Sequence, residues 1–161
     1  MRAGALLHDI GKIAIPEFIL NKPTVLTESE FEKMKIHPSV GARMLGGIEF
    51  PFPVEPLVKS HHERWDGKGY PEGLKGEDIP LLGRVLGVAD FLDALTSDRS
   101  YRKGLPLEEA LQMVKDLEGQ AFDPVVVKAA VDLHERGDLA LPTAPNPEVS
   151  AASQAQASGG Q

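Results

Sequence analysis

Two pairs of adjacent side chains in this sequence are of the types that bind metal ions. His61 and His62 are neighbours in the stretch HHERWDGKGYP, and His8 and Asp9 are neighbours in the stretch LLHDIGK. Histidine is scarce, yet four of the five histidines fall within the first 62 residues. Neutral imidazoles and carboxylates are ligands that suit iron, manganese and zinc. The sequence therefore predicts a metal centre.

Each adjacent pair could serve two metal ions rather than one. Neighbouring residues on a helix point about 100° apart, so the side chains of His8 and Asp9 cannot point in the same direction. The imidazole can bind one ion while the carboxylate bridges two, and the same geometry suits His61 and His62 at the end of a helix. Two metals about 3.5 to 4 Å apart clamp a phosphodiester and activate a water as the nucleophile. The pattern indicates metal-dependent phosphoester hydrolysis.

Two further residues are expected to complete the ligand set. His37 comes just before the Pro38 break, and Asp90 lies inside an otherwise apolar helical run, Val88–Leu92. A single histidine is more often a core or surface residue than a ligand, and Asp90 alone could be a carboxylate on a helix surface. A buried carboxylate, however, needs a cation, a hydrogen-bond network or a metal. Six ligand-type residues on four separate helices are harder to explain as packing, so the metal hypothesis is favoured.

The elements that must carry these residues are predicted to be helices. Ala3 to Ile10 has the pattern of a helix tail that stops at Gly11. Thr27 and Glu30 form a capping box that opens the next helix, which ends where Pro38 begins another in its first turn. Further helices are expected at 56–62, 84–97, 107–117 and 123–134.

A long loop and a polar tail interrupt and follow these helices. Residues 63–83 contain five glycines and two prolines, and a loop of that length in a compact domain is often functional. The chain from 139 to 161 is rich in Pro, Ser, Ala, Gln and Gly and lacks aromatics, so we expect a disordered tail. The predicted fold is all-α, with one domain at 1–138.

The composition excludes several classes of protein. A formal net charge of −7 gives no general attraction to duplex nucleic acid. The absence of cysteine removes disulfides, thiolate metal sites and cysteine nucleophiles. The apolar run at the N-terminus is too short for a signal peptide, and nothing later approaches a membrane span. We expect a cytoplasmic protein without membrane contact.

Several short motifs follow one another between about residue 3 and residue 135. They are His8-Asp9 with Gly11-Lys12, His37-Pro38, His61-His62-Glu63 with Asp66-Gly67 and Gly69-Tyr70-Pro71, and Asp90 with Asp93-Ala94-Leu95-Thr96. Together they resemble the HD-GYP family, a group within the HD superfamily of metal-dependent phosphohydrolases. The resemblance implies an HD-domain helical bundle that hydrolyses the bacterial second messenger cyclic di-GMP to pGpG, GMP or both.

The resemblance also implies roles for single residues. The implied metal ligands are His8, Asp9, His37, His61, His62 and Asp90, with Asp9 as the bridge. They imply two divalent ions, or three in the full-length family, with iron or manganese as the metal. Lys12 is implied to lie near the scissile phosphate, where its ammonium would neutralise developing charge. Arg99, Arg102 and Lys103 could hold the rest of the substrate, or equally form a basic helix end that suits the helix dipole.

The residue types of Gly69-Tyr70-Pro71 indicate no chemistry of their own. Glycine permits a turn, tyrosine offers an aromatic face and a hydroxyl, and proline fixes the exit. The resemblance associates this loop with the surroundings of the active site and with a partner signalling domain. Trp65 is predicted to anchor the loop by packing.

The chain departs from the family pattern at its start. Only seven residues precede His8, whereas the family carries a further histidine on earlier helices. We therefore expect an N-terminally truncated domain in which the site that uses Asp9, His37, His61 and His62 is nearly complete and the site that uses His8 and Asp90 is weakened. Five apolar residues would lose part of their cover, which favours association such as a homodimer: Leu6, Leu7, Ile10, Ile13 and Ile15.

Two alternatives to a cyclic di-GMP phosphodiesterase stay open. The first is an impaired or non-catalytic module that binds a ligand or a partner domain through the glycine-rich loop. It fits a truncated site, but the intact set of six downstream ligands argues against it. The second is an HD phosphohydrolase that acts on another phosphorylated nucleotide, which a panel of substrates would separate.

Overall fold

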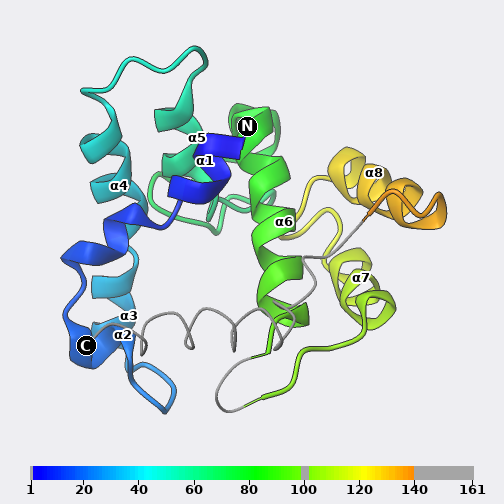
Figure 1. Ribbon diagram of the computed structural model, residues 1–161, viewed down its shortest axis with the longest axis horizontal. Helices are drawn as coiled ribbons and strands as arrows, with labels where there is room; N and C mark the ends of the chain where they lie inside the picture. The colour runs from blue at the N-terminus through cyan, green and yellow to red at the C-terminus, as the bar shows by residue number, and fades with distance from the viewer. Residues whose placement is uncertain (1, 99–101, 140–161) are drawn as a thin grey trace, which may run out of the picture.

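A computed structural model describes residues 2–98 and 102–139 of the protein, and in these ranges the secondary structure is helical. The order is α1 (Arg2–Leu7), the 3₁₀ helix η1 (Ile10–Ala14), α2 (Glu17–Leu20), α3 (Glu28–Met34), α4 (His37–Leu45), α5 (Val54–Ser60), the 3₁₀ helix η2 (Gly76–Asp78), α6 (Leu81–Thr96), α7 (Leu107–Asp116) and α8 (Pro124–Glu135) (Figure 1). No strand forms in these ranges, so the all-α prediction is confirmed. The predicted tail lies outside the described residues, except for Leu139.

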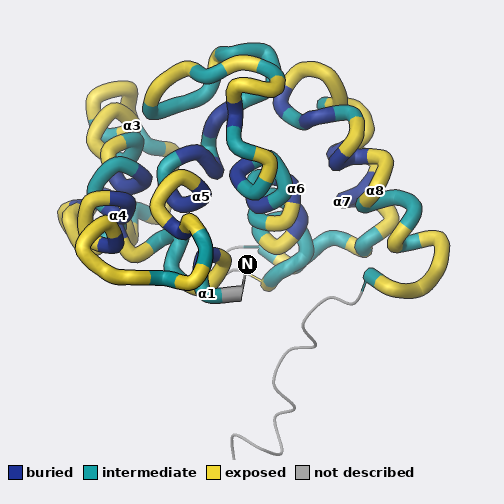
Figure 2. The backbone as a smooth tube through the Cα atoms, turned by 90° about the horizontal axis from the view of Figure 1, so that it is seen from above, coloured by how far each residue is buried: buried dark blue, intermediate teal, exposed yellow. Residues whose placement is uncertain are grey.

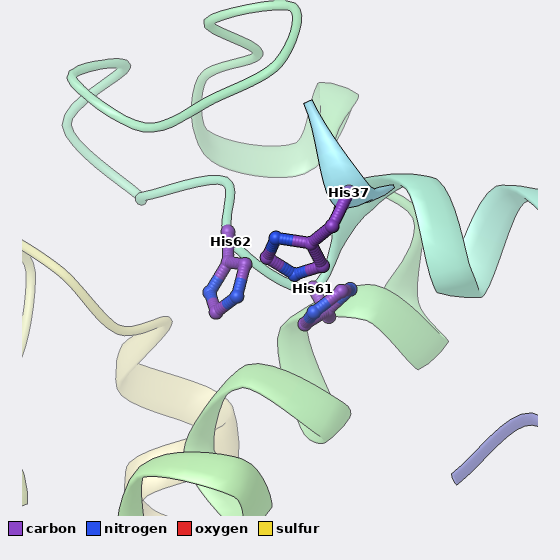
Figure 3. A group of neighbouring side chains, drawn as sticks. All are labelled: His37, His61 and His62. Carbon is purple, nitrogen blue, oxygen red and sulfur yellow. The ribbon is translucent and has the colours of Figure 1, made fainter. Parts of the chain in front are cut away.

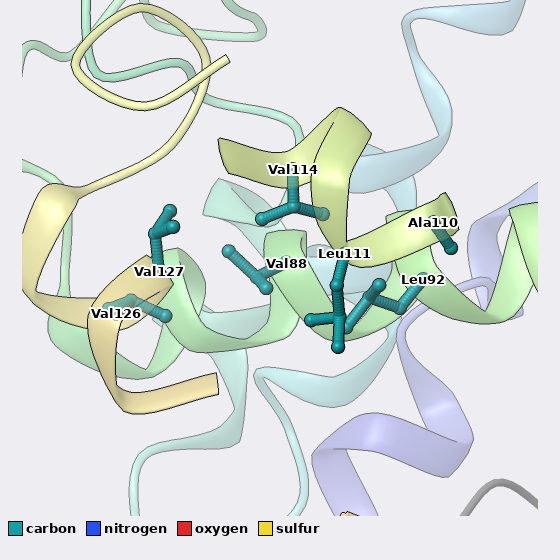
Figure 4. Packing of buried hydrophobic residues seen from close by; sticks show 7 residues of the cluster. All are labelled: Val88, Leu92, Ala110, Leu111, Val114, Val126 and Val127. Carbon is teal, nitrogen blue, oxygen red and sulfur yellow. The ribbon is translucent and has the colours of Figure 1, made fainter. Parts of the chain in front are cut away.

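Two hydrophobic cores lie on either side of α6. The core between α6, α7 and α8 is formed by Val88, Leu92, Ala110, Leu111, Val114, Val126 and Val127 (Figure 4). The core between α4, α5 and α6 is formed by Leu45, Val54, Leu57, Val58 and Leu86. In Figure 1, α4 and α5 lie on one side of α6, and α7 and α8 lie on the other. Figure 2 shows the buried segments turned inward between the helices and the exposed segments at the periphery. α6 therefore belongs to both cores.

The helix starts follow the local signals in the sequence. Glu30 N donates to Thr27 Oγ1 at 3.3 Å and Thr27 N donates to Glu30 Oε2 at 2.7 Å, which completes the predicted capping box of α3. Pro38 lies in the first turn of α4, where its missing N–H costs nothing. Asp123 caps α8 as predicted. These helix starts can therefore be predicted from the neighbouring residues alone.

The helix ends differ from the predictions. α1 ends at Leu7 rather than Ile10, so the expectation that His8 and Asp9 lie on a helix is wrong. The two residues form a turn into η1, closed by a hydrogen bond from Lys12 N to Asp9 O at 2.9 Å. α5 ends at Ser60, which leaves the second histidine pair just beyond its last turn. α6 begins at Leu81, three residues before the predicted start at 84.

The apolar residues of the N-terminal segment divide into exposed and buried ones. Leu6 and Ile13 are 81% and 80% exposed, as expected for residues that lack cover. Leu7 is half-buried against the core of α4, α5 and α6. Ile15 is buried, so its predicted exposure is wrong: it leaves η1 in an extended conformation and turns inward, like Ile19 one turn later. Among the described residues, no helix has the length and apolar character that crossing a bilayer requires.

Asp123 joins α8 to α6 through two interactions. Its Oδ1 accepts a hydrogen bond from Val125 N at 2.8 Å, and its Oδ2 accepts one from Arg84 Nη1 at 2.6 Å. The Asp123 side chain is 1% exposed. Replacing Asp123 by alanine is expected to lower the free energy of unfolding by about 3 kcal/mol, because it removes a helix cap and leaves the largely buried guanidinium of Arg84 without its partner.

Urea unfolding of Asp123→Ala measures this loss. Asp132→Ala is the control, because Asp132 forms an exposed i,i+4 pair with Lys128 on the same helix. That exposed pair is expected to contribute less than about 1 kcal/mol. Equal losses in the two variants would show that the Asp123 interaction is no stronger than a surface ion pair.

Candidate metal centre

Three of the candidate histidines have rings that are oriented by the same kind of hydrogen bond, from Nδ1 to a backbone carbonyl oxygen. His8 and His61 directly follow α1 and α5, and His37, the first residue of α4, comes three residues after the last residue of α3. The Nδ1 of each contacts the carbonyl oxygen three residues earlier. The distances are 2.6 Å to Ala5 O, 2.8 Å to Met34 O and 2.6 Å to Val58 O, respectively. Each acceptor is among the last carbonyls of its helix, which lack a helical partner. A carbonyl can only accept, so the proton of each ring must be on Nδ1.

The opposite nitrogen of each ring is thereby left with a free lone pair. His8 Nε2, His37 Nε2 and His61 Nε2 are buried and have no hydrogen-bond partner, and the same is true of Asp9 Oδ1. Among the described residues, Arg84 Nε is the one other buried side-chain atom in this condition. Buried polar atoms are normally satisfied. Four unsatisfied acceptors in one cluster are what a cation site requires.

Asp9 lies between two of these rings. Its Oδ2 is 3.4 Å from His8 Nε2, and its Oδ1 is 3.5 Å from His37 Nε2. Lys12 Nζ donates to Asp9 Oδ2 at 2.6 Å. Burial raises the pKa of Asp9, but the hydrogen bond and charge of Lys12 outweigh burial, so the pKa lies below its ordinary value. The carboxylate is therefore ionised and presents one oxygen to each side of the cluster.

Asp90 reaches the cluster because α6 approaches the end of α5 very closely. Gly83 and Gly87 face α5: a Cβ on Gly83 would lie 2.1 Å from Ser60 Oγ, and one on Gly87 would lie 2.9 Å from His61 O. Asp90 follows Gly87 by about one turn and so lies on the same face. Its Oδ1 is 3.4 Å from His8 Nε2. The side chain is 30% exposed, so Asp90 is less buried than the sequence predicts, although Val88 and Leu92 of the same run are buried.

The candidate ligands converge in two overlapping groups. His37, His61 and His62 offer ligand atoms within 4.8 Å of one another, and so do His8, Asp9 and His61. Figure 3 shows the rings of His37, His61 and His62 turned toward a common space. His61 belongs to both groups, which the sequence does not indicate. The nitrogen and carboxylate donors fit iron, manganese or zinc.

Burial keeps most of these imidazoles neutral. Burial lowers the pKa of His61 to about 4 and, together with the neighbouring imidazoles, that of His62 to about 3. Burial also lowers the pKa of His37. His8 is the exception, because its contact with Asp90 raises its pKa against the effect of burial. Neutral rings are the form that binds a metal.

Gly11 of the HDIGK motif holds the turn of His8 and Asp9 against α4. A Cβ on Gly11 would lie 2.0 Å from His37 O and 2.6 Å from Gly41 N. Glycine is the residue that permits such a close approach between two backbones. Gly11 therefore sets the distance between Asp9 and His37, a role that the sequence alone does not indicate.

The loop that contains Gly69-Tyr70-Pro71 packs directly on the second histidine pair. A Cβ on Gly69 would lie 2.3 Å from Arg64 N and 2.6 Å from His62 O. The ring centroids of Tyr70 and His62 are 4.9 Å apart, with 34° between the planes. The Tyr70-Pro71 peptide bond is cis. The motif thus has a structural task at the site that its residue types alone did not indicate.

The residues predicted to bind substrate do not all lie at the cluster. Lys12 is at the cluster, beside Asp9. Arg102 Nη2 donates to Ala94 O near the end of α6, which is the helix-end role that the sequence left open, and Lys103 is exposed. Arg99 lies outside the described residues. A substrate role for these three residues stays a prediction.

Trp65 takes part in the packing of the long loop. Its backbone N donates to Ala121 O at 3.1 Å, and the Arg84 guanidinium lies 5.8 Å from its ring centroid. The first contact ties the start of the loop to the segment between α7 and α8, and the second ties it to α6. They agree with the prediction of a packing anchor.

Comparisons with known proteins agree with this geometry. A family model described as HD domain matches residues 1–126. A cyclic di-GMP phosphodiesterase from Thermotoga maritima is 47% identical over 133 residues, which cover 81% of this chain and 36% of that protein. The 3'3'-cGAMP-specific phosphodiesterase 3 of Vibrio cholerae is 36% identical over 137 residues, which cover 83% and 30%.

A solved structure of an HDG"Y"P protein from Bdellovibrio bacteriovorus has a TM-score of 0.62 at 25% identity, and the match covers 82% of this chain and 42% of that one. The chain thus spans about a third of the length of the two phosphodiesterases, at 36% and 30%. The match to the family model covers most of the chain, and the motifs occur in the family's order. This chain therefore belongs to the HD domain family and, within it, to the HD-GYP group.

Proposed function

We propose that this domain hydrolyses a phosphodiester bond of a cyclic dinucleotide, with cyclic di-GMP as the leading substrate. The observation that carries the proposal is the convergence of unsatisfied Nε2 atoms on the carboxylate of Asp9 in one buried cluster. The relatives named as cyclic di-GMP and cGAMP phosphodiesterases support the substrate class. A partner signalling domain, a homodimer and a cytoplasmic location stay predictions from the sequence.

Six residues are proposed to hold two divalent ions, iron or manganese. His37, His61 and His62 would serve one ion, and His8 and Asp90 the other. Asp9 would bridge them, because its two oxygens already face His37 and His8. When bound, the ions would supply Lewis-acid polarisation of the phosphate and an activated water.

Lys12 supplies a cation that can move toward the substrate. Its ammonium lies 2.6 Å from Asp9 Oδ2, and its side chain is 36% exposed. It can therefore turn toward a phosphoryl oxygen at the mouth of the cluster and offset the negative charge that develops there. Its pairing with Asp9 also keeps the carboxylate ionised before substrate arrives.

The test measures metal content and hydrolysis on one sample, prepared without oxygen and loaded with iron or manganese. Cyclic di-GMP, 3'3'-cGAMP and linear pGpG are supplied in parallel, and the products are separated by chromatography. About two ions per chain with preference for a cyclic dinucleotide would support the proposal. Preference for the linear nucleotide would favour a hydrolase of another nucleotide, and metal-independent binding without turnover would favour the non-catalytic module.

Metal binding is expected to stabilise the metal-free protein. Free Mn²⁺ at 100 times its Kd adds about 2.7 kcal/mol to the free energy of unfolding, because only the folded chain brings the ligands together. Thermal unfolding with and without Mn²⁺ measures the gain. His61→Ala should lose most of it, whereas His134→Ala, which removes a histidine outside the cluster, should keep it. The same gain in both variants would place the bound metal elsewhere.

A further inference from the structure

His62 differs from the other three histidines of the cluster in how its ring is held. His8, His37 and His61 each have a bond from Nδ1 to a carbonyl oxygen. Neither ring nitrogen of His62 makes a hydrogen bond to any described residue, although the residue directly follows His61. A metal-binding histidine is normally oriented by a hydrogen bond from its second nitrogen. Something else must fix the orientation of the His62 ring.

Three aromatic rings lie close to the ring of His62. The rings of His61 and His37 lie 4.1 Å and 5.0 Å from it between centroids, and both belong to the cluster itself. The remaining neighbour is Tyr70, at 4.9 Å and with the smallest tilt of the three, 34°. Tyr70 N also donates to His62 O at 3.2 Å. Tyr70 therefore contacts both the ring and the backbone of His62.

The loop that carries Tyr70 is itself fixed at several points. Gly69 packs on the backbone of 62–64 at a distance that leaves no room for a Cβ. Glu63, which is buried, accepts hydrogen bonds from Glu72 N at 2.7 Å and from Leu74 N at 3.0 Å. Phe31 of α3 packs edge-on against the Tyr70 ring, with 6.1 Å between centroids. A ring held in this way can restrict the rotation of its neighbour.

We propose that Tyr70 is a positioning residue for His62, and that its ring face replaces the hydrogen bond that orients the other histidines. The proposal rests on the metal centre proposed above. It assigns the role to the aromatic face and not to the hydroxyl, which has no hydrogen-bond partner among the described residues. The Gly69-Tyr70-Pro71 motif then serves the metal site directly, with glycine for the close approach and tyrosine for the packing surface.

The test compares Tyr70→Leu with Tyr70→Phe by titration of the metal-free protein with Mn²⁺. The binding step to follow is the one that His62→Ala weakens. Loss of the ring in Tyr70→Leu is expected to raise the Kd of that step about 10-fold, in the range found for residues that orient a ligand. Tyr70→Phe keeps the ring and is expected to bind as tightly as the unchanged protein. Phe52→Leu is the control, because Phe52 packs on the core of α4, α5 and α6 between the end of α4 and the start of α5, the helix ends opposite to His37 and His61, and should cost stability without changing the Kd.

A second measurement does not depend on metal. In the metal-free protein, nuclear magnetic resonance is expected to show one side-chain rotamer of His62 in the unchanged protein and in Tyr70→Phe, and several in Tyr70→Leu. Unchanged affinity and rotamer in Tyr70→Leu would overturn the positioning role, and so would an equal loss in Tyr70→Phe. If His62→Ala itself binds Mn²⁺ as tightly as the unchanged protein, the failure lies in the proposed metal centre.

Discussion

Replacing Gly11 by alanine is expected to lower the free energy of unfolding by roughly 3 to 5 kcal/mol, a large loss for a single added methyl group. The added Cβ would lie 2.0 Å from His37 O and 2.6 Å from Gly41 N. Both are backbone atoms, so no side-chain rotation can relieve the overlap. Either η1 or the start of α4 must move, and the contacts between them must be remade. Urea unfolding of the metal-free protein measures the loss.

Gly47→Ala is the matched control for this substitution. Gly47 follows α4 and is exposed, and a Cβ at this position would have no heavy atom within 4 Å. It is expected to change the free energy of unfolding by less than about 0.5 kcal/mol. Gly11→Ala should also bind Mn²⁺ more weakly, because it separates Asp9 from His37. A Gly11→Ala variant as stable as Gly47→Ala would mean that η1 and α4 are not in this close contact.

Asp9→Asn is expected to reduce hydrolysis of a cyclic dinucleotide by roughly 10³-fold or more, because it removes the charge that both proposed ions share. The amide keeps the shape of the side chain, and the Asp9–Lys12 pair that it breaks is partly exposed. The metal-free variant should therefore unfold within about 1 kcal/mol of the unchanged protein. Steady-state kinetics with cyclic di-GMP, together with the metal content of the same samples, measure the effect.

Asp93→Asn provides the comparison. Asp93 is an exposed carboxylate of α6, three residues beyond Asp90, and its Oδ1 accepts a hydrogen bond from Ser97 Oγ at 3.3 Å. Its loss changes the net charge by the same amount as Asp9→Asn and should leave activity and metal content unchanged. Comparable activity in Asp9→Asn and Asp93→Asn would remove Asp9 from the proposed mechanism.

The sequence was sufficient for those features that depend on residue type and local order. The capping box of Thr27 and Glu30 and the cap at Asp123 are local signals, and the structure forms both. His37 and Asp90 could be recognised as candidate ligands from the sequence. His37 comes just before the Pro38 break, and Asp90 interrupts an otherwise apolar helical run. The structure brings these two residues into one cluster with the His8-Asp9 turn and the His61-His62 pair.

Features that depend on contacts between distant segments could not be predicted. Whether Nδ1 of His8 meets a carbonyl depends on α1 ending at Leu7, and helix ends are less certain from sequence than helix existence. Positions 11 and 69 require glycine because each lies directly against another part of the backbone. The backbone beside Gly11 is distant in the sequence, and the backbone beside Gly69 is an earlier segment onto which the chain folds back. The packing of Tyr70 on His62 likewise exists only once the loop has closed.

The place of α6 between two cores has a consequence for how the domain opens. Leu86 packs with α4 and α5, whereas Val88 and Leu92 pack with α7 and α8. Without a shared ligand, either half could open while α6 stays packed on the other. Ions held jointly by Asp90 of α6 and by the residues around α4 and α5 would tie α6 to that half of the domain. Metal loading would then protect the half formed by α4 and α5 from local opening and proteolysis, whereas α7 and α8, which carry none of the proposed ligands, would open from α6 as readily as before.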